Sequence, residues 1–246
     1  DNLIEALNFK EGDCVVDLAC GTGVNCVKIA QKIGPKGKLI GIDLSKGMLE
    51  EAQKRAKENS LENCEFIHDD MLKGIKSEKI VSNSFDKIVT FWALGYSDAP
   101  KVLKEMNRAL KNGGTMGIIV NLGESPKNAY KVFMELASEF PEAIKYAVNH
   151  NFPSDLDEFI EYFKKAGLNT ENLQAKYDSF TISLPNGSEV LNWMLQTGAG
   201  SLYDDAIDDS WKSKIHEMFA QRIERYKENN QINVTHEFIV AVYHKK

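Results

Sequence analysis

Apolar residues in the first half of the chain occur as short continuous runs separated by stretches with helical spacing. The short runs, which are typical of buried strands, occupy 14–19, 37–44, 64–70, 84–94 and 115–122. The stretches with an apolar residue every three or four positions, typical of amphipathic helices, occupy 23–34, 46–61 and 97–114. Strands that alternate with helices in this way predict parallel β-α-β units. The expected fold class is therefore α/β, a Rossmann-like doubly wound, mostly parallel sheet with helices on both faces.

Polar residues and glycines mark where several of these helices should begin and end. Ser45 is placed to cap the helix that follows it, and Asp98 or Ser97 is placed to cap the next one. Gly113 and Gly114 are expected to end that second helix before the fifth strand begins.

The second half of the chain contains more helix. The pattern predicts helices at 125–140, 153–168, 188–198 and 208–228, and strands at 173–184 and 233–245. This gives a seven-stranded sheet in which residues 186–229 form a helical insertion before the last strand. We interpret the insertion as a lid. Since the sequence contains no repeat and no linker rich in Pro, Gly or Ser, residues 1–246 are expected to form a single domain.

Composition narrows the function classes. The formal net charge of −6 argues against a surface built to neutralise nucleic-acid phosphates. No run of 18 apolar residues and no signal segment is visible, so a cytoplasmic protein without a membrane span is expected. Four cysteines without CxxC spacing are interpreted as reduced, buried residues, with a reactive thiol or metalloid site as the alternative. No metal site is expected.

The stretch "CVVDLACGTGVNC", residues 14–26, carries the most specific chemistry. A dinucleotide-binding loop has the pattern G-x-G-x-x-G, but Cys26 stands where the third glycine belongs. Asp17 would repel a pyrophosphate, whereas a carboxylate is suited to the amino group of a methionyl ligand. Ala19, Gly21 and Gly23 allow the backbone to approach such a ligand closely.

This D-x-A-x-G-x-G pattern resembles the glycine-rich motif of class I S-adenosylmethionine-dependent methyltransferases, with Ala19 where many members have glycine. Asp43 and Asp70, at the ends of the second and third strands, match the family's ribose and adenine contacts. The resemblance implies a cofactor frame of Asp17, Ala19, Gly21, Thr22, Gly23, Asp43, Leu44, Met48, Asp70, Met71, Phe91 and Trp92. Helix capping is the alternative role for Asp43 and Asp70, and Asp69 is an alternative to Asp70. Core packing is the alternative for the apolar residues Leu44, Met48, Phe91 and Trp92.

The sequence signals for the methyl acceptor are less specific than those for the cofactor. Tyr96, after the fourth strand, and His150, in a loop after the fifth, are the candidate catalytic residues. A packed loop aromatic is the alternative for Tyr96, and a surface histidine is the alternative for His150. Gly95 stands where many relatives have a histidine, and His236 alternates in phase with apolar neighbours, which predicts a core or sheet-face position. The aromatic residues of the insertion are interpreted either as a roof over an apolar acceptor or as core: Trp193, Tyr203, Trp211 and Phe219.

The sequence thus predicts an S-adenosylmethionine-dependent methyltransferase that transfers a methyl group to a small molecule by in-line displacement. It resembles both quinone-biosynthesis and small-carboxylate methyltransferases and does not choose between them. A non-catalytic S-adenosylmethionine-binding partner subunit and a nicotinamide-dependent oxidoreductase are the competing hypotheses. A homodimer is left open.

Overall fold

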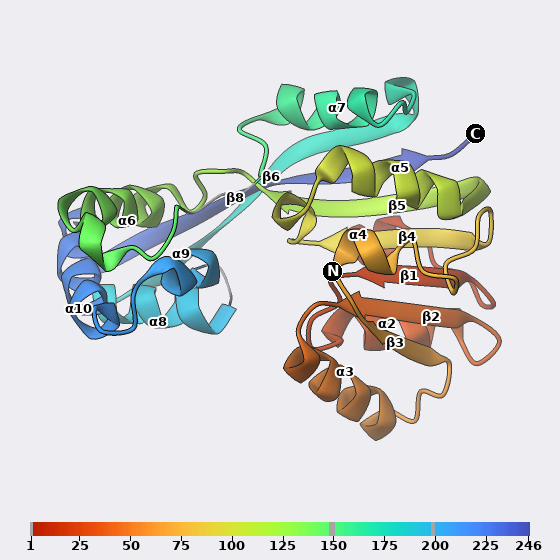
Figure 1. Cartoon of the computed structure of the whole chain (residues 1–246), viewed down its shortest axis with the longest axis horizontal. Helices are drawn as coiled ribbons and strands as arrows, with labels where there is room; N and C mark the ends of the chain where they lie inside the picture. The colour runs from red at the N-terminus through yellow and green to blue at the C-terminus, as the bar shows by residue number, and fades with distance from the viewer. Residues whose placement is uncertain (1, 148–150, 198–199) are drawn as a thin grey trace. The chain divides into compact units, whose positions relative to one another are not determined.

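The computed structural model describes residues 2–147, 151–197 and 200–246 (Figure 1). Its contacts divide the chain into two compact units. Unit 1 comprises Asp1–Val120, Asn151–Tyr177 and Ile239–Lys246, and unit 2 comprises Asn121–His150 and Asp178–Phe238. The predicted insertion at 186–229 falls within unit 2, which also takes in the residues that directly follow the fifth strand.

The strands form one sheet in the order β3-β2-β1-β4-β5-β8-β6, and a short β7 pairs with β8. The strands are β1 (Cys14–Leu18), β2 (Lys38–Asp43), β3 (Cys64–His68), β4 (Phe85–Phe91), β5 (Leu110–Asn121), β6 (Leu173–Leu184), β7 (Lys227–Glu228) and β8 (Gln231–His244). The pairs β3-β2, β2-β1, β1-β4 and β4-β5 are parallel, as predicted. The predicted α/β class is confirmed, with β7 as an addition to the seven expected strands.

Helices cover both faces of the sheet in unit 1 (Figure 1). They are α1 (Asn2–Ala6), α2 (Val24–Ile33), α3 (Lys46–Glu58), α4 (Met71–Gly74), α5 (Ala99–Ala109) and α7 (Leu156–Lys165), with 3-10 turns η1 (Leu94–Tyr96) and η3 (Thr170–Asn172). Apolar side chains of α1, α2 and α3 form one core cluster with β1, β2 and β4. On the other face, α5 packs between α4 and α7.

Three of the helix boundaries that the sequence predicts from capping or terminating residues can be compared with the structure. Ser45 caps α3 by accepting a hydrogen bond from the Met48 backbone N–H, and Asp98 caps α5. The predicted end of α5 at Gly113 and Gly114 is wrong, because the helix ends at Ala109. Leu110 is fully buried and pairs with Phe85, so the strand starts there, and the glycines lie in an irregular segment of β5.

Unit 2 has its own apolar core. Its helices are α6 (Lys127–Glu139), α8 (Gly187–Thr197), α9 (Ser201–Ala206) and α10 (Lys212–Ile223), with 3-10 turns η2 (Pro141–Ala143) and η4 (Glu224–Tyr226). Tyr203 and Phe219 are buried in this core, and Trp193 and Trp211 are partly buried against it. Within the described residues, no helix combines the length and the apolar character that crossing a membrane would need.

Candidate cofactor site

The carboxyl ends of β1 to β4 meet at one edge of the sheet in unit 1. The register pairs Leu18 with Ile42 on one side and with Thr90 on the other, and it pairs Asp43 with His68. The strand order reverses between β1 and β4. On one side of β1 lie β2 and β3, and on its other side lie β4 and β5. In open α/β sheets, ligands bind outside the strand ends at such a reversal.

The glycine loop between β1 and α2 uses left-handed backbone at three positions. Ala19, Gly21 and Gly23 have φ angles of 59°, 55° and 74°. A Cβ on Gly23 would lie 2.8 Å from the Cβ of Ala52, so this glycine allows α2 and α3 to pack closely. A Cβ on Gly21 would meet nothing within 4 Å, which leaves open space beside the backbone. Gly23 therefore serves helix packing, while Gly21 leaves room for a ligand.

Asp43 links this loop to the end of β2. Its Oδ2 accepts a hydrogen bond from the Gly21 backbone N–H at 2.8 Å, and its Oδ1 accepts one from the Ser45 N–H at 2.9 Å. Each carboxylate oxygen has a second lone pair, so both can still accept a hydroxyl hydrogen bond. The carboxylate that the sequence assigned to a ribose is thus held in a fixed place next to the open side of Gly21.

Asp17 lies inside unit 1, where its side chain is 1% exposed. Its Oδ2 accepts a hydrogen bond from the Cys26 thiol at 3.3 Å, and its buried Oδ1 has no hydrogen-bond partner among the described residues. Burial, the largest cause, and the negative charge of Asp43 raise the pKa of Asp17 to about 7, against the lowering effect of Cys26. Two neighbouring carboxyl groups, Asp17 in β1 and Asp43 at the end of β2, thus lie beside the loop, where they fit a cationic ligand and disfavour a pyrophosphate.

Asp70 caps the short helix α4. Its Oδ1 accepts hydrogen bonds from the backbone N–H groups of Leu72 and Lys73, at 2.9 and 3.2 Å. Asp69 supports it by accepting a bond from the Asp70 backbone N–H at 2.8 Å, and Met71 is buried. The capping alternative therefore describes the Asp70 geometry. A contact of Asp70 with adenine stays a prediction.

The apolar residues assigned to the cofactor divide into two kinds. Leu44 and Met48 are 69% and 45% exposed, near the start of α3, so their side chains are available to a ligand. Phe91 belongs to the buried core of unit 1, and Trp92, with a φ of 66°, packs against that core. Phe91 thus has the geometry of its core alternative, and its predicted ligand contact is untested.

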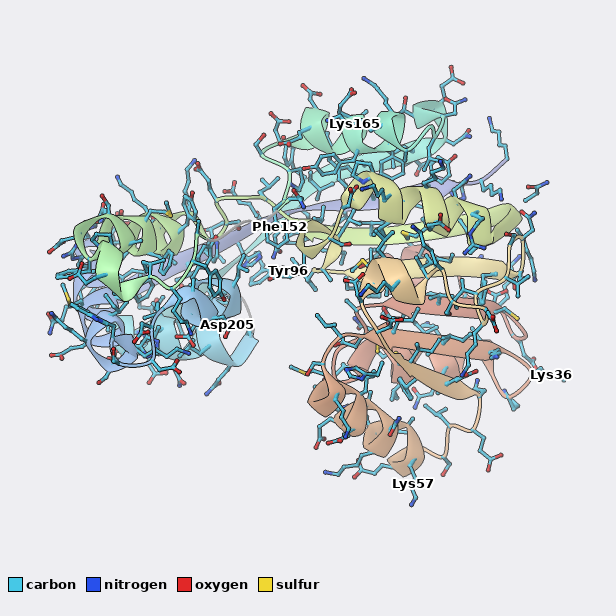
Figure 2. The ribbon with its side chains drawn as sticks, in the orientation of Figure 1. Lys36, Lys57, Tyr96, Phe152, Lys165 and Asp205 are labelled. Atoms are coloured by element: carbon cyan, nitrogen blue, oxygen red, sulfur yellow. The ribbon has the colours of Figure 1, made fainter. Side chains whose placement is uncertain are left out.

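Tyr96 lies in η1 after β4, and its side chain is half exposed. Its ring meets the ring of Phe152 edge to face, with centroids 4.9 Å apart (Figure 2). A Cβ on Gly95 would lie 2.0 Å from Phe152, so the phenyl ring fills the space beside this glycine. A histidine would therefore not fit there while Phe152 keeps its place. His150, the other predicted catalytic residue, lies outside the described residues.

The comparisons with known proteins agree with this geometry. The profile of a family described as a methyltransferase domain matches residues 9–221, which is most of the chain. The chain belongs to this methyltransferase family. The predicted methyltransferase superfamily is confirmed by this match.

Individual relatives match over different spans. Demethylmenaquinone methyltransferase of Listeria welshimeri is 33% identical over 117 residues, which are 47% of this chain and 48% of that protein. The chain therefore spans about half the length of the curated relatives it matches.

Solved structures are similar over nearly the whole chain. The YcgJ protein of Bacillus subtilis has a TM-score of 0.62 at 18% identity and covers 100% of this chain and 97% of its own. Geranyl diphosphate C-methyltransferase of Streptomyces coelicolor has a TM-score of 0.56 at 16% identity, over 98% of this chain and 76% of its own. At these identities, the similarity shows that the methyltransferase shares their fold.

Unit 2 of the methyltransferase holds an aromatic cluster that the sequence pattern missed in part. The cluster comprises Phe180, Trp193, His236 and Phe238, and the rings of Phe180 and His236 stack with centroids 5.4 Å apart. His236 is buried, as its alternation predicted, and its Nε2 lies 2.8 Å from Oδ1 of Asn121. Burial lowers the pKa of His236 to about 4. Its imidazole is therefore neutral at neutral pH.

Other polar features lie away from the glycine loop. A surface cavity of about 730 Å³ lies where β2 and β3 begin, and its lining contains none of the predicted cofactor residues. Over 2–147, 151–197 and 200–246, no three His, Cys, Asp or Glu side chains are grouped as a metal site would require. The edge at the carboxyl ends of β1 to β4 thus remains the candidate site.

Proposed function

We propose that the methyltransferase transfers a methyl group from S-adenosylmethionine to a small apolar molecule. The observation that carries this proposal is the position of Asp43, whose two oxygens accept hydrogen bonds from the Gly21 and Ser45 backbone N–H groups. This carboxylate joins the glycine loop to the end of β2, which is the arrangement that a ribose between the two loops would need.

The charge near the loop supports this cofactor over a dinucleotide. Asp17 and Asp43 are close enough for Asp43 to raise the pKa of Asp17. S-adenosylmethionine carries a sulfonium and an ammonium group, whose positive charges two carboxylates favour, whereas the pyrophosphate of a dinucleotide would be repelled. Because Asp17 is 1% exposed, it acts on the cofactor through its charge.

When bound, S-adenosylmethionine supplies a methyl carbon that its sulfonium already activates. The protein's task is then to align the acceptor with that carbon and to exclude water, and such alignment is worth roughly 7–11 kcal/mol in two-reactant reactions. Asp43 and the Gly21 backbone fix the donor end. We assign to Tyr96, which is half exposed next to Phe152, the task of orienting an acceptor or donating a hydrogen bond from its hydroxyl group.

The acceptor class follows from weaker observations. The relatives that resemble this chain are named for demethylmenaquinone and geranyl diphosphate, which supports an acceptor with a large apolar part. The net charge of −6 supports a small molecule over a nucleic acid. A general-base role for His150, a lid role for residues 186–229, a homodimer and a cytoplasmic location remain predictions.

Calorimetric titration tests the cofactor assignment. We expect the wild-type protein to bind S-adenosylmethionine and S-adenosylhomocysteine and to give no signal with NAD. Asp43→Ala should weaken binding of both by about 1–3 kcal/mol, because charge-assisted hydrogen bonds are lost. Glu58→Ala, at the far end of α3, is the matched control and should bind as the wild type does. Unchanged affinity in Asp43→Ala would mean that the ribose is misplaced.

A screen with methyl-labelled S-adenosylmethionine tests the reaction. Quinols, isoprenoid diphosphates and small carboxylic acids would be offered separately, and label transfer to an apolar acceptor is expected. Tight cofactor binding without transfer to any acceptor class would favour the non-catalytic partner subunit. Transfer only to carboxylic acids would overturn the apolar acceptor but leave the methyltransferase assignment intact.

A further inference from the structure

Cys26 lies directly after the glycine loop, and its contact with Asp17 gives it a specific place beside the cofactor site. It lies in the first turn of α2, is 1% exposed, and donates a hydrogen bond from its thiol to Oδ2 of Asp17 at 3.3 Å. This thiol is the one hydrogen-bond donor to the carboxylate among the described residues, since Oδ1 has none. The protonation of Asp17 therefore depends on Cys26.

A thiol is well suited to this position, because it donates without bringing a positive charge. The hydrogen bond with Cys20, burial and the negative charge of Asp17 all raise the pKa of Cys26 well above its usual range. Cys26 therefore stays protonated and remains a donor. A lysine or arginine in its place would cancel the charge of Asp17, which a neutral thiol leaves in place.

The groups that act on Asp17 come from three segments and have unequal effects. Burial in unit 1 and the Asp43 carboxylate at the end of β2 favour the protonated acid. The Cys26 thiol from α2 favours the ionised form, and Cys20, in the loop itself, acts through Cys26. The hydrogen bond from Cys26 thus offsets part of the effect of burial and allows Asp17 to be ionised near neutral pH.

We propose that Cys26 is a positioning residue for the cofactor, which it serves by holding Asp17 ionised beneath the glycine loop. This inference rests on the proposed function, because the charge of Asp17 matters only if a cationic cofactor binds nearby. It assigns to the missing third glycine of the loop a role in recognising the positive charge of S-adenosylmethionine. Cys26 would have little effect on a ligand with the same adenosine part and no charge.

The test compares S-adenosylmethionine with 5′-methylthioadenosine, which is uncharged and lacks the amino-acid part. Dissociation constants would be measured by calorimetry at pH 6, 7 and 8. For the wild type, the affinity for S-adenosylmethionine should rise several-fold over this range as Asp17 ionises, and the affinity for 5′-methylthioadenosine should stay constant. Cys26→Ala should weaken S-adenosylmethionine binding about threefold to tenfold at pH 7, with a smaller loss at pH 8, and leave 5′-methylthioadenosine within twofold.

Three variants separate this role from a merely structural one. Cys26→Ser keeps a neutral donor and should restore the wild-type pH profile. Asp17→Asn should abolish the pH dependence, and Cys26→Ala should then have no further effect in that background. Cys64→Ala removes another partly buried thiol, on β3, and should bind both ligands as the wild type does.

Two results would overturn the inference. One is an equal loss for both ligands in Cys26→Ala, which would indicate a disturbed loop. The other is a full effect of Cys26→Ala in the Asp17→Asn background. Failure of the proposed function is distinguishable, because the wild type would then bind neither ligand. If Cys26→Ala does not fold, the pH profiles of the wild type, Cys26→Ser and Asp17→Asn decide the question alone.

Discussion

Each of the two units buries a titratable side chain whose pKa is shifted mainly by burial: Asp17 in unit 1 and His236 in unit 2. In unit 1, burial raises the pKa of Asp17 to about 7, and in unit 2 it lowers the pKa of His236 to about 4. Both shifts favour the neutral form, as the low polarity of a protein interior requires. The acid, however, lies next to a loop with a recognisable motif, whereas the histidine lies in an aromatic cluster without one. The difference separates a site that a motif identifies from a site that only the structure reveals.

The largest expected losses of stability come from replacing one glycine in each unit, Gly23 in unit 1 and Gly187 in unit 2. A Cβ on Gly23 would lie 2.8 Å from the Cβ of Ala52, and one on Gly187 would lie 1.9 Å from the Ala220 carbonyl oxygen. We expect each Gly→Ala variant to lower the free energy of unfolding by about 3 kcal/mol or more, from overpacking and, at Gly23, backbone strain. Urea unfolding measures this. Gly12→Ala is the control, since its φ is also positive but a Cβ there has open space.

The same pair of variants tests whether the units have separate tasks. All predicted cofactor residues lie in unit 1. Folded Gly187→Ala protein should therefore bind S-adenosylhomocysteine with an affinity close to that of the wild type, whereas Gly23→Ala should lose binding. Equal loss in both variants would show that unit 2 supports the cofactor frame.

The raised pKa of Asp17 predicts that the stability of the folded protein falls as the pH rises. Its folded pKa of about 7 lies above its ordinary value of 3.8, so between these values the folded state binds more protons than the unfolded state. Its contribution to stability is complete below pH 4 and is lost as the pH rises to about 7. Asp17→Asn should remove this loss, on the order of a few kcal/mol. Unfolding measured from pH 5 to pH 8 would show a steeper decline in the wild type than in the variant.

His236 predicts a pH dependence of stability with the opposite sign, over a pH range that overlaps that of Asp17. Its folded pKa of about 4 lies below its ordinary value of 6.5, so the unfolded state binds more protons between these values. The stability that it contributes is present above pH 6.5 and is lost as the pH falls towards 4. His236→Gln should flatten this acid limb by roughly 2 kcal/mol. If the acid limb stayed as steep in the variant, His236 would have to charge without penalty in the folded state.

The parts that the sequence predicted share a physical reason. The strands and helices of unit 1 follow from hydrophobic periodicity, and Asp43 follows from a motif at a fixed spacing. The four-residue helix α4 was missed because it is too short to show a period, and its cap at Asp70 is its main signal. Periodicity contains even less information about contacts between distant residues. Phe152 fills the space beside Gly95 only once the chain has folded back, and no local sequence pattern predicts that contact.

The Cys26 and Asp17 contact illustrates the same limit at short range. The two residues are nine positions apart and meet only because the loop between them turns through left-handed backbone at three positions. The sequence shows that Cys26 replaces the third glycine, and from the sequence we interpret this cysteine as a small buried residue. Its burial was predicted correctly, but the hydrogen bond depends on the loop conformation, which the pattern of residues does not specify.

The smallest predicted effect tests that conformation directly. Ala19 has a φ of 59°, in the left-handed region that costs an alanine roughly 1–2 kcal/mol and a glycine almost nothing. Ala19→Gly relieves this strain but makes the unfolded chain more flexible, which returns part of the gain. We expect a net stabilisation of about 0.5–1 kcal/mol in urea unfolding, with unchanged affinity for S-adenosylhomocysteine. Ala30→Gly, at a buried helical position of α2, is the control and should be destabilising. If Ala19→Gly were destabilising too, the loop would not have the left-handed turn at Ala19 on which the Cys26 and Asp17 contact depends.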